Sequence, residues 1–148
     1  MHLYHGTLDA KKYRFEAFCH FGTRTAAVER IARRLLDGYQ GEPVILKLRF
    51  KFEEKQILKI EDDWGSNQPI AVARALKDYF KGKDSEKYSI FEGIRCDLIT
   101  AKAAGQEFRQ MGWDQLSKTL QKIGICVIGY RNVVEDVGAY SYCVVEPT

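Results

Sequence analysis

The sequence predicts a single α+β domain. Short runs of alternating or β-branched residues, typical of strands, fall near the two ends of the chain, and most amphipathic stretches that favour helices lie between them. The 148 residues suffice for one ordinary domain with a hydrophobic core and are too few for two comfortable ones. We therefore expect one domain over 1–148, whose sheet joins N-terminal and C-terminal segments.

Composition narrows the class of protein further. Hydrophobic residues make up 45% and charged residues 29% of the chain, which is typical of a folded protein. The net charge of +3 is too small to indicate a nucleic-acid partner by itself. The 4 cysteines lie far apart with no C-x-x-C pair, which disfavours a zinc or redox centre, so no metal is expected. No export signal or membrane-spanning run is visible, which predicts a cytoplasmic protein without a membrane partner.

The chain begins with a predicted strand that carries a histidine. Residues 2–5 alternate in the manner of a short strand, and Gly6-Thr7 ends it. The strand end thus places His5 beside a glycine whose backbone a ligand can approach closely. Residues 8–16 are polar and lysine-rich, which predicts a surface loop.

A second short strand is predicted over 17–21, followed by a helix. Gly22-Thr23 ends the strand, and Thr23 or Thr25 can cap a helix that continues to about Gly38. The first N–H groups of a helix have no partner within the helix and carry the positive end of its dipole. The residues around Gly22 are therefore suited to an anionic or amide-bearing ligand.

The middle of the chain is predicted to hold two strands and then helices. The strands cover 43–50 and 56–60 and are joined by a charged turn, and residues 62–67 form a loop. Pro69 opens a helix that reaches about Phe80. The pattern over 81–111 is ambiguous, and we expect a helix over 91–104 and a connection over 105–111 there. A clearer helix follows over 113–123.

The C-terminal segment combines a buried strand with a polar turn. Residues 125–130 are apolar throughout, which indicates a strand buried on both faces. Asn132, Glu135 and Gly138 then break the pattern before a second strand around Tyr142. Exposed loops on a rigid sheet often hold reactive groups, so Glu135 is a candidate catalytic residue as well as a candidate solvated turn acid.

Three short motifs follow one another along the chain. They are Tyr4-His-Gly-Thr7, His20-Phe-Gly-Thr23 followed by two alanines, and Tyr130-x-Asn-x-x-Glu-Asp-x-Gly138 leading to Ser141-Tyr142. This combination resembles the ADP-ribosyltransferase family, particularly the small His-aromatic-Glu members of phage and bacterial conflict proteins. Residues 51–120 carry no part of the resemblance.

The resemblance implies a fold, an activity and partners. The fold would be an ADP-ribosyltransferase-like split β-sheet core with flanking helices. The activity would be NAD-dependent transfer of ADP-ribose to a macromolecular acceptor, or hydrolysis of NAD, by a toxin or phage effector in the cytoplasm of a bacterial or phage-infected host cell. NAD would be the substrate, and the acceptor would be a protein or a nucleic acid that the sequence does not identify.

The resemblance also implies roles for individual residues. His5 would hold a ribose hydroxyl of NAD, the Gly6 backbone would pair with the nicotinamide amide, and Phe21 would line the nicotinamide ring. Glu135 would bind the 2′-hydroxyl of the nicotinamide ribose and stabilise the cation that develops at the anomeric carbon. The remaining motif residues complete the predicted cofactor-binding set: Thr7, Gly22, Thr23, Asn132 and Ser141.

The sequence departs from the family pattern at two points. Many relatives place the catalytic glutamate at the head of the last strand, where this chain has Ser141, and Glu135 lies six positions earlier. Either Glu135 reaches in from the loop, or the acid is lost and the protein is a non-catalytic nucleotide- or protein-binding module. A tyrosine of the second motif is replaced by Phe21. An RNA 2′-phosphotransferase-like enzyme, which also uses NAD on this fold, is a further alternative.

Overall fold

The computed structural model describes residues 1–11, 14–61, 63–65 and 67–147. Within these ranges the chain forms a mixed α+β fold with four α-helices and two small β-sheets. The predicted α+β class is thereby confirmed. Parts of the predicted loops over 8–16 and 62–67 lie outside the described residues. None of the helices in the described ranges is both long enough and apolar enough to cross a membrane.

The chain divides into two compact units. One consists of Met1–Asp63 and Gly124–Thr148 and is called the sheet unit here, because both β-sheets belong to it. The other, Trp64–Ile123, is called the helical unit. The expectation of a single domain over 1–148 stays a prediction, because contacts within each unit do not decide whether the two unfold together.

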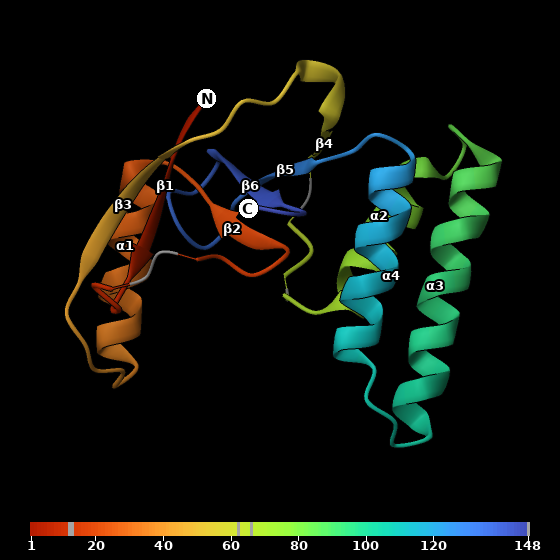
Figure 1. Ribbon diagram of the computed structural model, residues 1–148, viewed down its shortest axis with the longest axis horizontal. Coiled ribbons are helices and arrows are strands. Elements are labelled where there is room, and N and C mark those ends of the chain that lie inside the picture. The colour runs from red at the N-terminus through yellow and green to blue at the C-terminus, as the bar shows by residue number, and fades with distance from the viewer. Residues whose placement is uncertain (12–13, 62, 66, 148) are drawn as a thin grey trace. The chain divides into compact units, whose positions relative to one another are not determined.

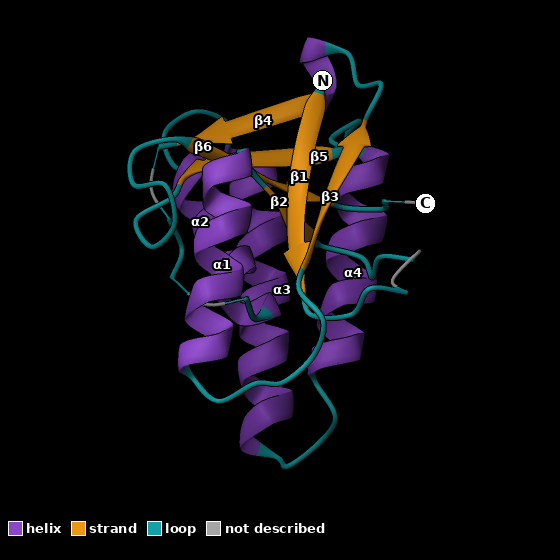
Figure 2. Cartoon of the chain, turned by 90° about the vertical axis from the view of Figure 1, so that its left-hand side faces the viewer, coloured by secondary structure: helices purple, strands orange, loops and turns teal. Residues whose placement is uncertain are grey.

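The smaller sheet of the sheet unit is an antiparallel pair. Strand β1 (His2–Thr7) pairs with β3 (Val44–Arg49), so that His5 lies opposite Leu46 and Thr7 opposite Val44. Figure 2 shows the two strands running side by side. Along β3 the leucines are half-buried and Lys47 and Arg49 are exposed, which confirms the alternation seen in the sequence.

The larger sheet has the order β2-β6-β5-β4. Its strands are β2 (Cys19–Phe21), β6 (Tyr140–Val144), β5 (Val127–Arg131) and β4 (Ile57–Ile60). The pairing of β2 with β6 joins N-terminal and C-terminal segments, and β5 is buried through its first four residues, both as predicted. The sequence did not reveal that β3 and β4 belong to different sheets. A short 3-10 helix, η1 (Glu54–Gln56), lies between them, and β4 pairs in parallel with β5.

Helix α1 (Arg24–Leu36) packs against the smaller sheet, as Figure 1 shows beside β1 and β3. Of the two predicted caps the structure uses Thr23, whose hydroxyl accepts the Ala26 N–H at 3.0 Å. Beyond the C-terminus Gly38 adopts a φ of +90°, a conformation that favours glycine. The predicted helix is therefore confirmed, and its N-terminus directly follows β2.

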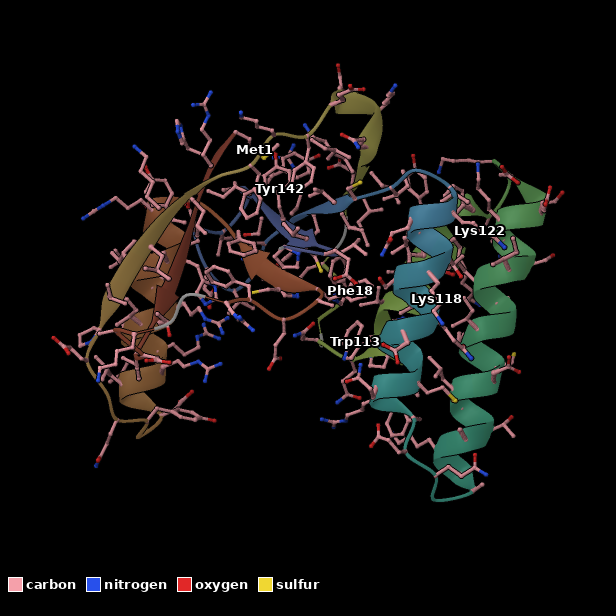
Figure 3. All side chains as sticks on the ribbon, in the orientation of Figure 1. Met1, Phe18, Trp113, Lys118, Lys122 and Tyr142 are labelled. Atoms are coloured by element: carbon pink, nitrogen blue, oxygen red, sulfur yellow. The ribbon has the colours of Figure 1, made fainter. Side chains whose placement is uncertain are left out.

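The helical unit consists of α2 (Pro69–Phe80), α3 (Ser85–Ala103) and α4 (Arg109–Lys122), and Figure 3 labels Trp113, Lys118 and Lys122 along α4. Helix α2 has the predicted bounds. The helix expected over 91–104 is present as part of α3, but its start was missed, because α3 begins at Ser85 with Asp84 as its cap. The expected connection over 105–111 is shorter, because α4 begins at Arg109. Beyond the polar first turns, buried residues recur at helical spacing to the end of α3: Phe91, Ile94, Leu98 and Ala101.

Close packing of α4 on α2 makes Gly112 a sensitive position. A Cβ atom at Gly112 would lie 2.5 Å from Cβ of Pro69 and 3.0 Å from Cδ1 of Leu98. We expect Gly112→Ala to lower the free energy of unfolding by about 1–3 kcal/mol through overpacking. Gly93→Ala is the matched control, because a Cβ atom there meets open space in the middle of α3. It should raise stability by about 0.5–1 kcal/mol.

Urea denaturation followed by tryptophan fluorescence measures both effects. The 2 tryptophans of the chain, Trp64 and Trp113, belong to the helical unit, so their emission reports on the element that the substitutions alter. Equal unfolding midpoints for the two variants would contradict the close contact at Gly112.

Candidate functional site

A crevice in the sheet unit brings the three sequence motifs together. It lies where the ends of β1 and β2, the first turns of α1 and the loop over 132–139 meet, and it holds about 280 Å³ of space including its open mouth. Seven of the nine predicted site residues line it: His5, Gly6, Phe21, Gly22, Asn132, Glu135 and Ser141. Thr7 and Thr23 are the two that do not.

Backbone pairing explains why the motifs meet. Tyr4 and Gly22 form an isolated bridge, in which each N–H donates to the carbonyl oxygen of the other residue at 2.8 and 2.9 Å. This bridge joins the middle of β1 to the residue that follows β2. The pairing of β6 with both β2 and β5 then brings Ser141 opposite Tyr130 at the same end of the sheet.

The His5 side chain is buried and oriented by its surroundings. Its Nδ1 atom lies 3.0 Å from the carbonyl oxygen of His20, and its ring packs against Phe15 and Phe21 with centroids 5.3 and 5.5 Å away. A carbonyl oxygen only accepts, so Nδ1 carries the proton in this hydrogen bond. In the neutral ring Nε2 is consequently the nitrogen that can accept a hydrogen bond.

Gly6 is required by the packing of β1 on α1. A Cβ atom at this position would lie 2.2 Å from the carbonyl oxygen of Ala27 and 3.0 Å from Cγ1 of Ile31. The sequence suggested that a ligand approaches the backbone of this glycine. The structure shows that the backbone of α1 lies against it at Ala27. Gly22 is similarly enclosed, with Oγ of Ser141 at 3.0 Å from the position of an added Cβ.

The hydroxyls of the two remaining predicted residues make contacts within the chain. Oγ1 of Thr7 accepts the N–H of Asp9 at 3.1 Å beyond the end of β1. Thr23 caps α1, and its hydroxyl also donates to the carboxylate of Asp136. Thr23 therefore supports the loop over 132–139 from α1.

Asn132 organises the loop that holds Glu135. Its buried side chain accepts the N–H groups of Val134 and Glu135 through Oδ1, both at 2.9 Å, and donates through Nδ2 to Oγ of Ser141 at 3.0 Å. Its backbone N–H donates to the carbonyl oxygen of Ala139 at 3.0 Å. The amide thus fixes the start of the loop and orients Glu135 relative to β6.

Helix α1 holds the opposite side of the same loop. The N–H of Asp136 donates to Oε2 of Glu29 at 2.6 Å, and Asp136 has a φ of +44°, which is uncommon for a residue with a side chain. Arg33 also donates to the carbonyl oxygen of Val134 at 3.5 Å. The Glu135 backbone is therefore anchored from both sides.

Removing the Asn132 side chain is expected to disorder the loop. Asn132→Ala leaves the N–H groups of Val134 and Glu135 without their acceptor, and we expect it to lower the free energy of unfolding by about 1–3 kcal/mol. Val133→Ala is a control in the same loop, since Val133 is 62% exposed and its truncation should cost less than about 0.5 kcal/mol. Thermal unfolding followed by circular dichroism compares the two. A smaller loss for Asn132→Ala than for Val133→Ala would contradict this role.

Opposing influences act on the Glu135 carboxyl group. Partial burial raises its pKa above the ordinary value, and the positive charges of Arg30 and Arg33 act in the opposite direction. The negative charge of Glu29 adds to the increase in pKa. The carboxyl group is therefore half-buried in a crevice beside an arginine, as expected for a group that meets a ligand.

Sequence reasoning missed the roles of three further lining residues. His20 and Tyr130 are hydrogen-bonded, with His20 Nδ1 2.7 Å from the tyrosine hydroxyl, and burial raises the pKa of Tyr130 so that the phenol stays protonated. Arg30 lines the crevice from α1. Its position was readable, because it follows Ala26 by four residues and Ala27 by three, which is the spacing of one helix face.

The crevice combines groups suited to a polar ligand with an aromatic part. A histidine, a carboxyl group, a guanidinium group and the Phe21 ring line the same crevice. The described residues include no cluster of three or more His, Cys, Asp or Glu that could hold a metal ion. Such a set can bind a glycosidic or phosphorylated ligand and stabilise positive charge near Glu135. The chain matches no protein-family model, no curated protein sequence and no solved structure.

Proposed function

We propose that the protein is an NAD-dependent ADP-ribosyltransferase, or an NAD glycohydrolase when water is the acceptor. The observation that supports this most strongly is that His5 and Glu135, from opposite ends of the sequence, line one crevice together with Phe21. These are the three residue types of the His-aromatic-Glu pattern. The proposed fold is the ADP-ribosyltransferase-like split sheet, and the two small sheets linked by the Tyr4–Gly22 bridge are compatible with it.

The proposed reaction breaks the bond between nicotinamide and ribose. The bonding electron pair moves to the nicotinamide nitrogen, neutral nicotinamide leaves, and the ribose becomes an oxocarbenium-like cation. The Glu135 carboxylate would stabilise this cation and accept a hydrogen bond from the 2′-hydroxyl. His5 Nε2 would accept a hydrogen bond from a ribose hydroxyl, and the Phe21 ring would flank the nicotinamide. The acceptor then attacks the anomeric carbon and loses its proton.

Labelled NAD tests this proposal directly. The purified protein is incubated with NAD that carries one label on nicotinamide and another on adenine, first alone and then with a cell lysate. Release of nicotinamide is expected, together with adenine label in either the protein or the nucleic-acid fraction, or in free ADP-ribose. Intact NAD after long incubation under both conditions would contradict the enzymatic function.

A binding module without catalysis is the second candidate. It is favoured by the position of Glu135 on a loop, six residues ahead of Ser141, and by the burial that raises the pKa of its carboxyl group. This candidate predicts binding of NAD or ADP-ribose without nicotinamide release. An RNA 2′-phosphotransferase-like enzyme would instead consume NAD only when an RNA with a 2′-phosphate is present, so adding such an RNA to the same assay separates the three.

A further inference from the structure

Arg30 has an unsatisfied donor at the crevice. It lies in the second turn of α1 and lines the crevice, and its Nε atom is buried without a hydrogen-bond partner among the described residues. Buried polar groups are nearly always hydrogen-bonded, and a charged group without a partner is costly. A ligand in the crevice would supply the acceptor that Nε of Arg30 lacks among the described residues.

Small residues line the crevice beside Arg30. Ala26 and Ala27 lie on the same face of α1 as Arg30, one turn closer to its N-terminus. Gly22, which directly precedes the α1 cap Thr23, also lines the crevice. The positive end of the α1 dipole lies on this side and favours an anion.

Glu135 is an acid that interacts with the charge of Arg30 across the crevice lining, and it does not form a tight ion pair with the guanidinium group. Arg30 is the strongest influence that lowers the pKa of Glu135, yet burial still holds this pKa above the ordinary value. A tight bidentate ion pair would depress the pKa of the carboxyl group instead. An arginine side chain has five N–H donors, so a ligand can bind beside the carboxylate.

We propose that Arg30 binds a phosphate group of the nucleotide that occupies this crevice, so that the site selects phosphorylated nucleotides over nucleosides. The planar guanidinium group matches two phosphate oxygens at once, which an ammonium group does not do. The proposal extends the proposed function, since NAD carries two phosphates, and it names the substrate class for that site. It also gives a role to a charge that lies beside the reacting carboxylate.

The test compares ligands that differ only in their phosphates. Binding of ADP and of adenosine is measured by calorimetry with the wild-type protein, Arg30→Gln and Arg34→Gln. Neither ligand contains the bond that the proposed reaction breaks. Arg34 is the control, because it is an exposed arginine of the same helix and does not line the crevice.

Wild-type protein is expected to bind ADP at least ten times more tightly than adenosine. Arg30→Gln should weaken ADP binding by about ten- to a hundredfold, the effect of losing a charge-assisted hydrogen bond, and leave adenosine binding unchanged. Arg34→Gln should change ADP binding less than threefold. Equal affinity of the wild-type protein for ADP and adenosine would overturn the proposal without reference to any variant.

The outcomes separate this inference from the proposed enzymatic function. If NAD is never cleaved but ADP binding depends on Arg30, the phosphate site is supported and the proposed enzymatic function is refuted. If NAD is cleaved and Arg30→Gln leaves both ADP binding and the KM for NAD unchanged, the enzyme stands and the phosphate site is refuted. Circular dichroism of Arg30→Gln confirms that the variant is folded in either case.

Discussion

Replacing Glu135 with glutamine is expected to slow nicotinamide release by at least about a hundredfold. Glutamine keeps the size of the side chain and can still bind a hydroxyl, but it has no negative charge to stabilise the oxocarbenium-like cation. The hydrogen bond from Glu135 to Oδ1 of Asn132 is donated by the backbone N–H, which the substitution does not change. The loop should therefore keep its conformation. The rate is measured as nicotinamide released from NAD at saturating concentration. Glu42→Gln, which removes an exposed carboxylate outside the crevice, should retain full activity.

The pH dependence of stability shows whether the Glu135→Gln variant is folded. Burial raises the pKa of Glu135 in the folded protein above the value of about 4.3 expected in the unfolded chain. The folded state therefore binds a proton more readily, and the ionised carboxylate costs stability above the folded-state pKa. Glu135→Gln should consequently be at least as stable as the wild-type protein at pH 7. Its advantage should disappear as the pH falls below about 4.

The same pKa sets the acid limit of the proposed reaction. Since the carboxylate must be ionised to stabilise a cation, activity should fall with decreasing pH at a midpoint above the ordinary glutamic acid value. Wild-type activity in Glu135→Gln, with no change in this profile, would remove Glu135 from the mechanism and favour the binding module.

Local signals predicted several elements closely, because the chain carries explicit start and stop residues. Thr23 caps α1 and Pro69 opens α2, and the sequence placed both helices correctly. The start of α3 was missed although Asp84 caps it through the N–H of Lys87, since the polar first turn concealed the apolar residues that follow. The pairing of β4 with β5 was also missed, because the whole helical unit separates these two strands in the sequence.

The sequence likewise predicted only part of the candidate site. Motif order identified His5, Phe21 and Glu135, and the structure brings all three to one crevice. The sequence did not predict the contacts that stabilise the site, because they join residues far apart in the chain, such as Asp136 with Glu29. Motifs of residue types do not show which distant residues come into contact. Arg30 shares a helix face with Ala26 and Ala27, which the sequence shows, but only the packing of α1 against β1 indicates that this face borders the crevice.

Gly6→Ala is expected to have the largest effect on stability of any substitution in the crevice. In an ordinary strand this change is favourable by about 0.5–1 kcal/mol, because glycine loses more conformational freedom on folding. Here the added methyl group would lie 2.2 Å from the carbonyl oxygen of Ala27, which belongs to a helix backbone and cannot rotate away. Strand β1 must therefore separate from α1, at a cost of about 3 kcal/mol or more.

Gly22→Ala provides the comparison that isolates this contact. Its closest neighbours would be Oγ of Ser141 at 3.0 Å and Cβ of Ala26 at 3.2 Å, so small shifts of side chains can relieve the crowding. We expect a loss of about 1 kcal/mol in its free energy of unfolding. Far-ultraviolet circular dichroism in urea measures both variants, since the strands and α1 contribute to it. If Gly6→Ala proved as stable as Gly22→Ala, β1 would not pack on α1 as closely as this structure has it, and the position of His5 at the crevice would lose its support.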